Sequence, residues 1–221
     1  MSLKQKDYLL NAQKFEIPAN IEKAPGIKLG DKLIKSVLLS TDLSYIQNLN
    51  SDAVMIINPF DKSNKLDKVV IEFTPKPVIC DVGGGFLREE ATIKSAVGAF
   101  KVGAAGVVIT KPTAPEIIRR IRNEINGLLI YTVMFDAEPF DELADAGADI
   151  FNISTGVGTP ETVQSVKELL PDIPIMANGG PQDATILETI EMGADAIVFN
   201  PPTATEILRS IFDGYRNYIR Q

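Results

Sequence analysis

The chain has 221 residues, of which 45% are apolar and 23% charged, and its formal charge is −7. This composition is typical of a folded chain and excludes a disordered, collagen-like or coiled-coil protein. No stretch approaches the roughly 20 consecutive apolar residues of a membrane span, and no Lys/Arg cluster suits a phosphate backbone. We therefore expect neither a membrane nor a nucleic acid as partner.

Histidine is absent from the sequence, and Cys80 is the single cysteine. The first fact excludes His-dependent catalytic triads and histidine metal sites. The second excludes a disulfide framework and a cysteine zinc cluster. Residues 1–15 lack the apolar core of a secretory signal. We therefore expect a cytoplasmic protein without a metal site.

Residues 1–35 are expected to form an extension, with a helix between Ser2 and Phe15 and a connector around Pro18 and Pro25. In residues 36–221, short apolar runs alternate with helical patterns. The runs expected to be strands are Val37–Ser40, Ala53–Ile57, Val78–Asp81, Gly106–Thr110, Leu128–Val133, Ile150–Ile153, Ile173–Ala177 and Ala196–Phe199. Several are apolar throughout, as in parallel strands covered on both faces. The pattern predicts an α/β fold, a single (β/α)8 TIM barrel, with an open doubly wound sheet as the alternative.

Two segments of the chain repeat one pattern. Residues 103–121 read GAAGVVITKPTAPEIIRRI, and residues 193–211 read GADAIVFNPPTATEILRSI. Each copy follows a block with a proline, an apolar run and glycines, PVICDVGGG at 77–85 and PIMANGG at 174–180. The repeats fall on the expected strands 3–4 and 7–8, which predicts two similar half-barrels closed into one barrel.

These glycine-rich blocks resemble those of the ribulose-phosphate-binding barrel superfamily, and most of all the histidine-biosynthesis isomerase and cyclase barrels. The resemblance implies an aldolase-type barrel whose loops after strands 3 and 7 hold phosphate groups, with an acid/base pair at the ends of strands 1 and 5. The chain departs from that pattern at Lys111-Pro112 and Pro201-Pro202, because proline has no N–H to donate. We therefore expect neither of the two histidine enzymes.

Strand ends carry the chemistry of barrel enzymes, and four charged residues stand at them. Asp42, Asp81 and Asp136 are candidate proton-transferring groups, although aspartate at such a place also caps the next helix. Lys111 is a candidate to balance anionic charge or to form a Schiff base with a carbonyl group. A solvated surface lysine is the alternative.

Glycine, asparagine and hydroxyl residues at the same strand ends are candidate ligand-binding groups. A glycine loop lets a phosphate oxygen approach the backbone at the start of a helix, but glycine also simply turns the chain. Asparagine can hydrogen-bond sugar hydroxyls. The candidates are Asn58, Gly83, Gly84, Gly85, Ser154, Thr155, Asn178, Gly179, Gly180 and Asn200.

Three further segments have structural interpretations. The T-x-x-E patterns at Thr113–Glu116 and Thr203–Glu206 predict capping boxes at two helix starts. Because such a box uses the N–H groups that an anion would need, it counts against phosphate at the ends of strands 4 and 8. Cys80 is expected to be a small apolar side chain inside its strand.

Together these features predict an isomerase, epimerase or lyase acting on a small phosphorylated sugar or carbonyl metabolite, without a metal or other cofactor. Three alternatives remain open. The glycine loops suit an FMN-binding barrel, and the three aspartates suit a Mg-dependent hydrolase or lyase. The blocked strand ends suit a barrel that senses a metabolite without turnover. A homodimer is also considered, although no exposed apolar stripe stands out in the sequence.

Overall fold

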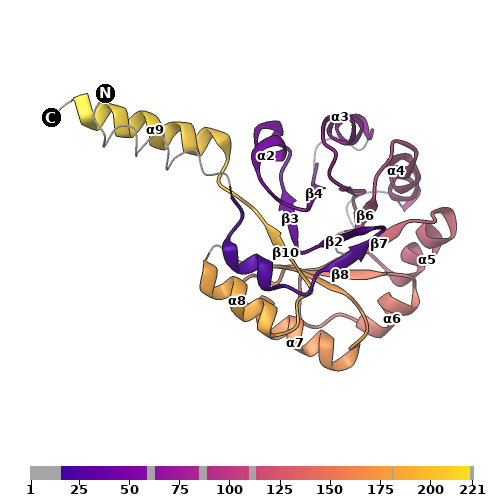
Figure 1. Cartoon of the computed structure of the whole chain (residues 1–221). Helices are drawn as coiled ribbons and strands as arrows, with labels where there is room; N and C mark the ends of the chain where they lie inside the picture. Colours follow the sequence, from indigo (N-terminus) through magenta and orange to yellow (C-terminus); the bar gives the residue numbers. More distant parts are fainter. Residues whose placement is uncertain (1–15, 59–62, 85–88, 110–112, 181, 220–221) are drawn as a thin grey trace.

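The structure is a computed structural model that describes residues 16–58, 63–84, 89–109, 113–180 and 182–219. Parallel strands close a barrel in the order β10-β3-β4-β5-β6-β7-β8-β9 (Figure 1). They are β3 (Ser36–Leu39), β4 (Ala53–Ile56), β5 (Val78–Asp81), β6 (Gly106–Ile109), β7 (Leu128–Val133), β8 (Ile150–Ile153), β9 (Ile175–Asn178) and β10 (Ala196–Phe199). The predicted (β/α)8 barrel is confirmed, and each expected strand lies within two residues of an observed one.

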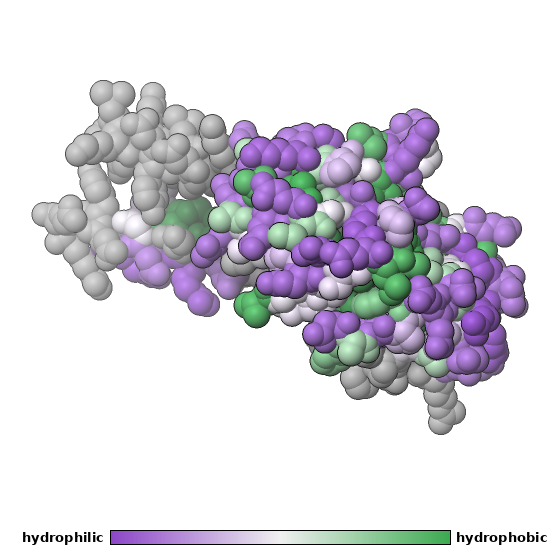
Figure 2. Space-filling model, turned by 90° about the horizontal axis from the view of Figure 1, so that it is seen from below, coloured by the Kyte–Doolittle hydropathy of each residue, from purple (hydrophilic) through white to green (hydrophobic). Residues whose placement is uncertain are grey.

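Helices follow the barrel strands and cover most of its outer wall (Figure 1). They are α2 (Leu43–Asn48), α3 (Lys65–Phe73), α4 (Glu89–Lys101), α5 (Pro115–Glu124), α6 (Phe140–Asp145), α7 (Thr159–Leu169), α8 (Asp183–Glu191) and α9 (Ala204–Ile219), with a 3-10 turn η2 (Gly156–Gly158) before α7. No helix in the described part of the chain is long and apolar enough to span a membrane. The face seen in Figure 2 is mostly hydrophilic.

The buried side chains form two layers because successive strand residues point to opposite faces. In β8, for example, Ile150 belongs to the cluster inside the barrel, whereas Phe151 belongs to the cluster between strands and helices. The inner cluster also contains Val37, Met55, Ile79, Val108, Ile130, Met176 and Val198. The part of the barrel interior on the amino-terminal side of the strand ends is therefore a packed apolar core.

Residues 16–35 are not the simple connector that the sequence predicts. They form a 3-10 helix η1 (Ala19–Lys23) and an antiparallel hairpin of β1 (Ile27–Leu29) and β2 (Lys32–Ile34). Ile27 and Ile34 pair across the hairpin and join the inner cluster. The hairpin thus closes the amino-terminal end of the barrel, while the helix predicted between Ser2 and Phe15 lies outside the described residues.

Two repeated segments of the sequence occupy β5–β6 and β9–β10, which are separated by two strands on either side of the closed barrel. Their capping boxes differ. The Thr203 N–H and hydroxyl donate to Glu206 Oε2 at 2.7 and 2.9 Å, which lowers the pKa of Glu206. The other predicted box is wrong, because Ala114 is the N-cap of α5 and Pro115 follows it. Proline favours the first helical position, so it moves the helix start by one residue.

Aspartates immediately before three strands fix the amino-terminal end of the barrel. The carboxylates of Asp52, Asp149 and Asp195 accept N–H bonds from Ser36, Leu129 and Ile175, at 2.9, 2.8 and 2.8 Å. Each bond crosses to the start of the preceding barrel strand. Asp195 is also paired with Lys167 at 2.9 Å.

Replacing Asp195 by Ala is expected to destabilise the fold by about 1–3 kcal/mol, because the Ile175 N–H loses its charged acceptor in a half-buried position. Urea unfolding followed by circular dichroism measures the change. Asp172→Ala, at an exposed aspartate in the preceding loop, is the control and should stay within about 0.5 kcal/mol of wild type. Equal stability of the two variants would contradict the role given to Asp195.

Candidate active site

Polar side chains replace the apolar core where the strands end at the carboxyl-terminal mouth of the barrel. Asp81 is the last residue of β5, Thr132 and Asn152 lie one residue before the ends of β7 and β8, and Asn178 ends β9. Asp81, Thr132 and Asn152 are buried, with 7%, 6% and 3% of their surface exposed. Buried polar groups normally have hydrogen-bond partners, so their bonding describes the site.

Two asparagines in this layer have a free acceptor atom. Asn152 Nδ2 donates to Thr132 Oγ1 at 3.2 Å, and Asn178 Nδ2 donates to Ser154 Oγ at 2.6 Å. The Oδ1 atoms of both asparagines are buried and have no hydrogen-bond partner within the described part of the chain. An unsatisfied buried acceptor costs about 1–3 kcal/mol. A ligand with hydroxyl or amine donors would remove this cost.

A turn that contains two glycines follows Asp81, and one of them donates a hydrogen bond to its carboxylate. The Gly83 N–H donates to Asp81 Oδ1 at 2.9 Å, and Gly83 and Gly84 have φ angles of 90° and 134°. Residues with a side chain rarely adopt these angles, so the sequence needs glycine here for the turn itself. Gly85 and Lys111, two further candidates, lie outside the described residues.

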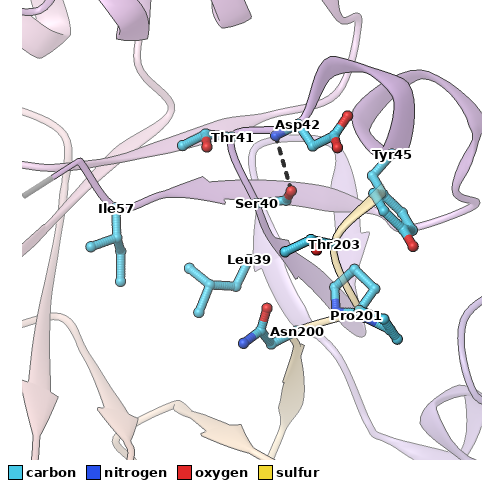
Figure 3. A pocket seen from close by; sticks show the side chains of 10 residues that line it. Leu39, Ser40, Thr41, Asp42, Tyr45, Ile57, Asn200, Pro201 and Thr203 are labelled. Atoms are coloured by element: carbon cyan, nitrogen blue, oxygen red, sulfur yellow. Dashed lines mark hydrogen bonds between the residues drawn. The ribbon is translucent and has the colours of Figure 1, made fainter. Parts of the chain in front are cut away.

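Asp42 and Asn200 line a hollow of about 610 Å³ between the ends of β3 and β10 (Figure 3). Asp42 Oδ1 accepts the Ser44 N–H at 2.9 Å and so caps α2. The capping interpretation of Asp42 is therefore confirmed. Tyr45 also lines this hollow. Burial is the largest cause that raises the pKa of its phenol, and the nearby charges of Asp42 and Glu206 raise it further.

Asp136 lies in a different hollow, of about 380 Å³, together with Thr155 and Glu161. It is exposed and follows β7, which stands opposite β3 in the closed barrel. Asp42 and Asp136 therefore do not line one common hollow. Among the described residues, no group of three His, Cys, Asp or Glu side chains is placed to hold a metal ion. The arrangement of Asp42, Asp81 and Asp136 thus does not support the magnesium alternative.

The glycine pair after β9 borders a third hollow, of about 300 Å³, with Asn178 and Glu188. A Cβ on Gly179 would lie 2.9 Å from Ile186 Cγ1 and 3.0 Å from Ile197 Cγ2, so this glycine is required for the packing of α8 against β10. Gly180 has φ +75°, which suits a turn. The described lining residues include the Glu188 carboxylate and no Lys or Arg. This charge is unfavourable for phosphate.

Sequence reasoning missed Thr132, Asn152 and a buried tyrosine. Alternation along β8 could have revealed Asn152, because Ile150, Asn152 and Ser154 share the inward face.

Tyr131, on the outer face of β7, donates to Glu138 Oε2 at 3.3 Å and accepts the Thr113 N–H. Burial raises the pKa of this phenol. Tyr131 thus connects the loops that follow β6 and β7. Asn58, after β4, is half-buried.

Cys80 should not react with a thiol reagent in the native protein. The side chain is fully buried, and burial, followed by the charges of Asp67 and Asp81, raises the pKa of the thiol. Because the thiolate is the reactive form, we expect no labelling by DTNB at pH 8 until denaturant unfolds the chain. Rapid labelling without denaturant would show that β5 opens to solvent.

No family model and no curated protein matches the chain. Solved structures do match it. A 2,3-dimethylmalate lyase, described as a member of the PEP mutase/isocitrate lyase superfamily, is 15% identical over 91% of this chain and 86% of its own, with a TM-score of 0.66. A phosphonopyruvate hydrolase is 13% identical over 92% and 84%, with a TM-score of 0.60. An aldolase named QR15 is 22% identical over 74% and 87%, with a TM-score of 0.58.

These structures are barrels of the aldolase and lyase type, and at such low identities the likeness shows a shared fold. Activity does not follow from a shared barrel, because one fold supports many reactions. The likeness to the histidine-biosynthesis barrels stays a prediction.

Proposed function

We propose that the chain is a lyase or isomerase that moves a proton next to a carbonyl group of a small polar metabolite. The observation that carries this proposal is the buried carboxylate of Asp81 at the carboxyl end of β5, within the polar layer of the mouth. Barrel enzymes place their reacting groups at this end of the strands. The lyase and aldolase names of the similar structures support the same class of reaction.

Asp81 would act as the general base. Its carboxylate takes a proton from the carbon next to the carbonyl, and the electron pair moves to the carbonyl oxygen. In an isomerase the proton returns to the former carbonyl carbon, while the hydroxyl on the deprotonated carbon passes its proton to the former carbonyl oxygen and becomes the new carbonyl. In a lyase Asp81 instead takes the proton of a hydroxyl group two carbons from the carbonyl carbon. That hydroxyl becomes a carbonyl as the adjacent carbon–carbon bond breaks, the electron pair of the bond forms an enolate, and the proton is then delivered to the enolate carbon. The Oδ1 atoms of Asn152 and Asn178 would accept hydrogen bonds from substrate hydroxyls and hold the reacting carbon in place.

The substrate is proposed to be a phosphorylated sugar or a related carbonyl compound, and the reaction to need no metal. The positive φ angles of Gly83 and Gly84 give the backbone a shape in which N–H groups can face an anion. The third hollow, with Glu188, is the weaker place for phosphate. Lys111 remains a candidate to neutralise the anion.

Proton exchange with solvent tests this proposal. The protein is incubated in D2O with pyruvate, oxaloacetate, dihydroxyacetone phosphate or glyceraldehyde 3-phosphate, with and without EDTA, and loss of the C–H signals is followed by NMR. We expect enzyme-dependent exchange with at least one compound, undiminished by EDTA. No exchange above the buffer rate with any of them would overturn the proposal, and loss of exchange in EDTA would overturn metal independence.

A barrel that binds a metabolite without turnover is the second candidate. Pro201 and Pro202 line the hollow of about 610 Å³ and offer no N–H to a reacting anion, and Asp42 beside them is engaged in capping (Figure 3). A thermal shift with one of the same compounds, without any exchange, would support this candidate.

A further inference from the structure

α9 projects away from the barrel (Figure 1). One face of this helix carries exposed apolar side chains in the described part of the chain. Leu208, Phe212 and Tyr215 have 51%, 52% and 39% of their surface exposed. These residues, with Ile207 and Ile211, recur every three or four positions and so share one helix face. The charged residues Glu206, Arg209, Asp213 and Arg216 occupy the opposite face.

The repeat within the sequence shows what such a face normally does. α5 belongs to the other copy of the repeat, and its Ile118 and Ile121 correspond to Leu208 and Ile211 of α9. Both isoleucines of α5 are fully buried in the outer core. The same pattern is thus a packing face in α5 and an exposed face in α9.

α9 cannot take the corresponding place on its own barrel, because residues 17–23 already occupy the wall beside α8. η1 lies against α8 (Figure 1). Ile17 and Ile21 are buried in the outer core. The Ile17 N–H donates to Asn50 Oδ1 at 2.8 Å, and Lys35 Nζ donates to the Glu22 carbonyl at 2.7 Å. Packing α9 against this wall would require all of these contacts to break.

We propose that α9 is a dimerisation helix whose apolar face packs against the same face of α9 in a second copy of the chain. An interface made by one face with itself needs only a two-fold axis, the commonest symmetry of protein oligomers. Charge does not oppose it. The charged residues of α9 within the described chain are two acidic and two basic, although the whole chain carries −7.

The size of the helix sets the expected strength of the dimer. Sixteen residues make a helix about 24 Å long and about 10 Å wide. Its face offers a few hundred Å² to a partner, less than the roughly 800 Å² that each protein buries in a standard interface. We therefore expect a reversible dimer that forms with rising concentration in the micromolar range.

Sedimentation velocity across that concentration range tests the proposal. The full chain is expected to shift from monomer to dimer, and Leu208→Gln with Phe212→Gln to raise the dimer dissociation constant about tenfold or more. The matched control, Arg209→Gln with Asp213→Gln, changes the opposite face and should dimerise as wild type. Because all four side chains are exposed, the melting temperatures of both double variants should match wild type.

Three results would overturn the proposal. The first is a wild-type chain that stays monomeric throughout the range, and the second is a Leu208→Gln, Phe212→Gln variant that dimerises as strongly as wild type. The third is a monomeric full chain that dimerises only when residues 1–15 are deleted, which would assign the apolar face to that segment. None of these measurements depends on catalytic turnover, so the dimer and the proposed reaction fail separately.

Discussion

Replacing Asp81 by Asn is expected to lower the rate of proton exchange by about 10²–10⁴-fold while leaving the fold intact. The introduced carboxamide keeps an oxygen that can accept the Gly83 N–H bond, at present 2.9 Å long, so the turn after β5 should survive. It lacks the negative charge and the ability to take a proton. The measurement is the rate of deuterium incorporation into whichever carbonyl compound the wild-type protein exchanges.

Asp67 provides a matched control for the loss of a buried carboxylate. It is 6% exposed, close to the 7% of Asp81, but lies on α3 and accepts from Asn64 Nδ2 at 2.8 Å. Asp67→Asn should exchange protons at the wild-type rate even if its melting temperature falls. If Asp81→Asn retains the wild-type rate, or if both variants lose it equally, Asp81 is not the base.

The barrel could be predicted from sequence because the pattern of apolar and polar residues in each strand reflects which of its faces are covered. β5 and β10 are apolar except for Asp81 at the end of β5, and β8 is apolar except for the inward-facing Asn152. This composition is typical of strands that are covered on both faces. The hairpin was missed although its signal is present. Gly30-Asp31 separates two short runs in which apolar residues are spaced for pairing, and Gly30 has φ +62°.

The candidate site was harder to predict because strand order tells which residues reach the mouth but not which hollow they enter. Asp42, Asp136 and Asn178 all lie at strand ends as expected, yet they line three separate hollows. Their directions depend on the loops after each strand, where Asp42, for example, accepts the Ser44 N–H and caps α2. The cap at Asp42 could be predicted from its place before a helix, but the hollow that each of these residues lines could not.

The apolar face of α9 is a second feature whose surroundings could not be predicted from the sequence. Its residues are visible in the sequence, but the pattern equals that of the buried α5. Only the three-dimensional position of Ile17 and Ile21 shows that the usual place of the helix is filled. No exposed apolar stripe stands out in the sequence for this reason, whereas the structure exposes Leu208, Phe212 and Tyr215 on α9.

Replacing Gly179 by Ala is expected to destabilise the protein by about 1–3 kcal/mol through overpacking. The added Cβ would lie 2.9 Å from Ile186 Cγ1 on α8 and 3.0 Å from Ile197 Cγ2 on β10, and 3.4 Å from the Ile186 Cα. Both isoleucine side chains are buried, so neither can move aside without disturbing the outer core. For a chain of this size the melting temperature should fall by about 2–4 °C for each kcal/mol.

Gly158 is the matched control, because the nearest atom to its added Cβ is Thr155 Oγ1 at 4.0 Å and its φ of −88° is ordinary. Gly158→Ala should therefore cost less than Gly179→Ala in urea unfolding. If Gly179→Ala is as stable as wild type, α8 is free to shift and a ligand could approach the backbone at this glycine. If Gly179→Ala loses much stability, weaker phosphate binding by a Gly179 variant would result from a damaged fold and not from a lost anion site. The anion site must then be tested at Gly83 or Gly84.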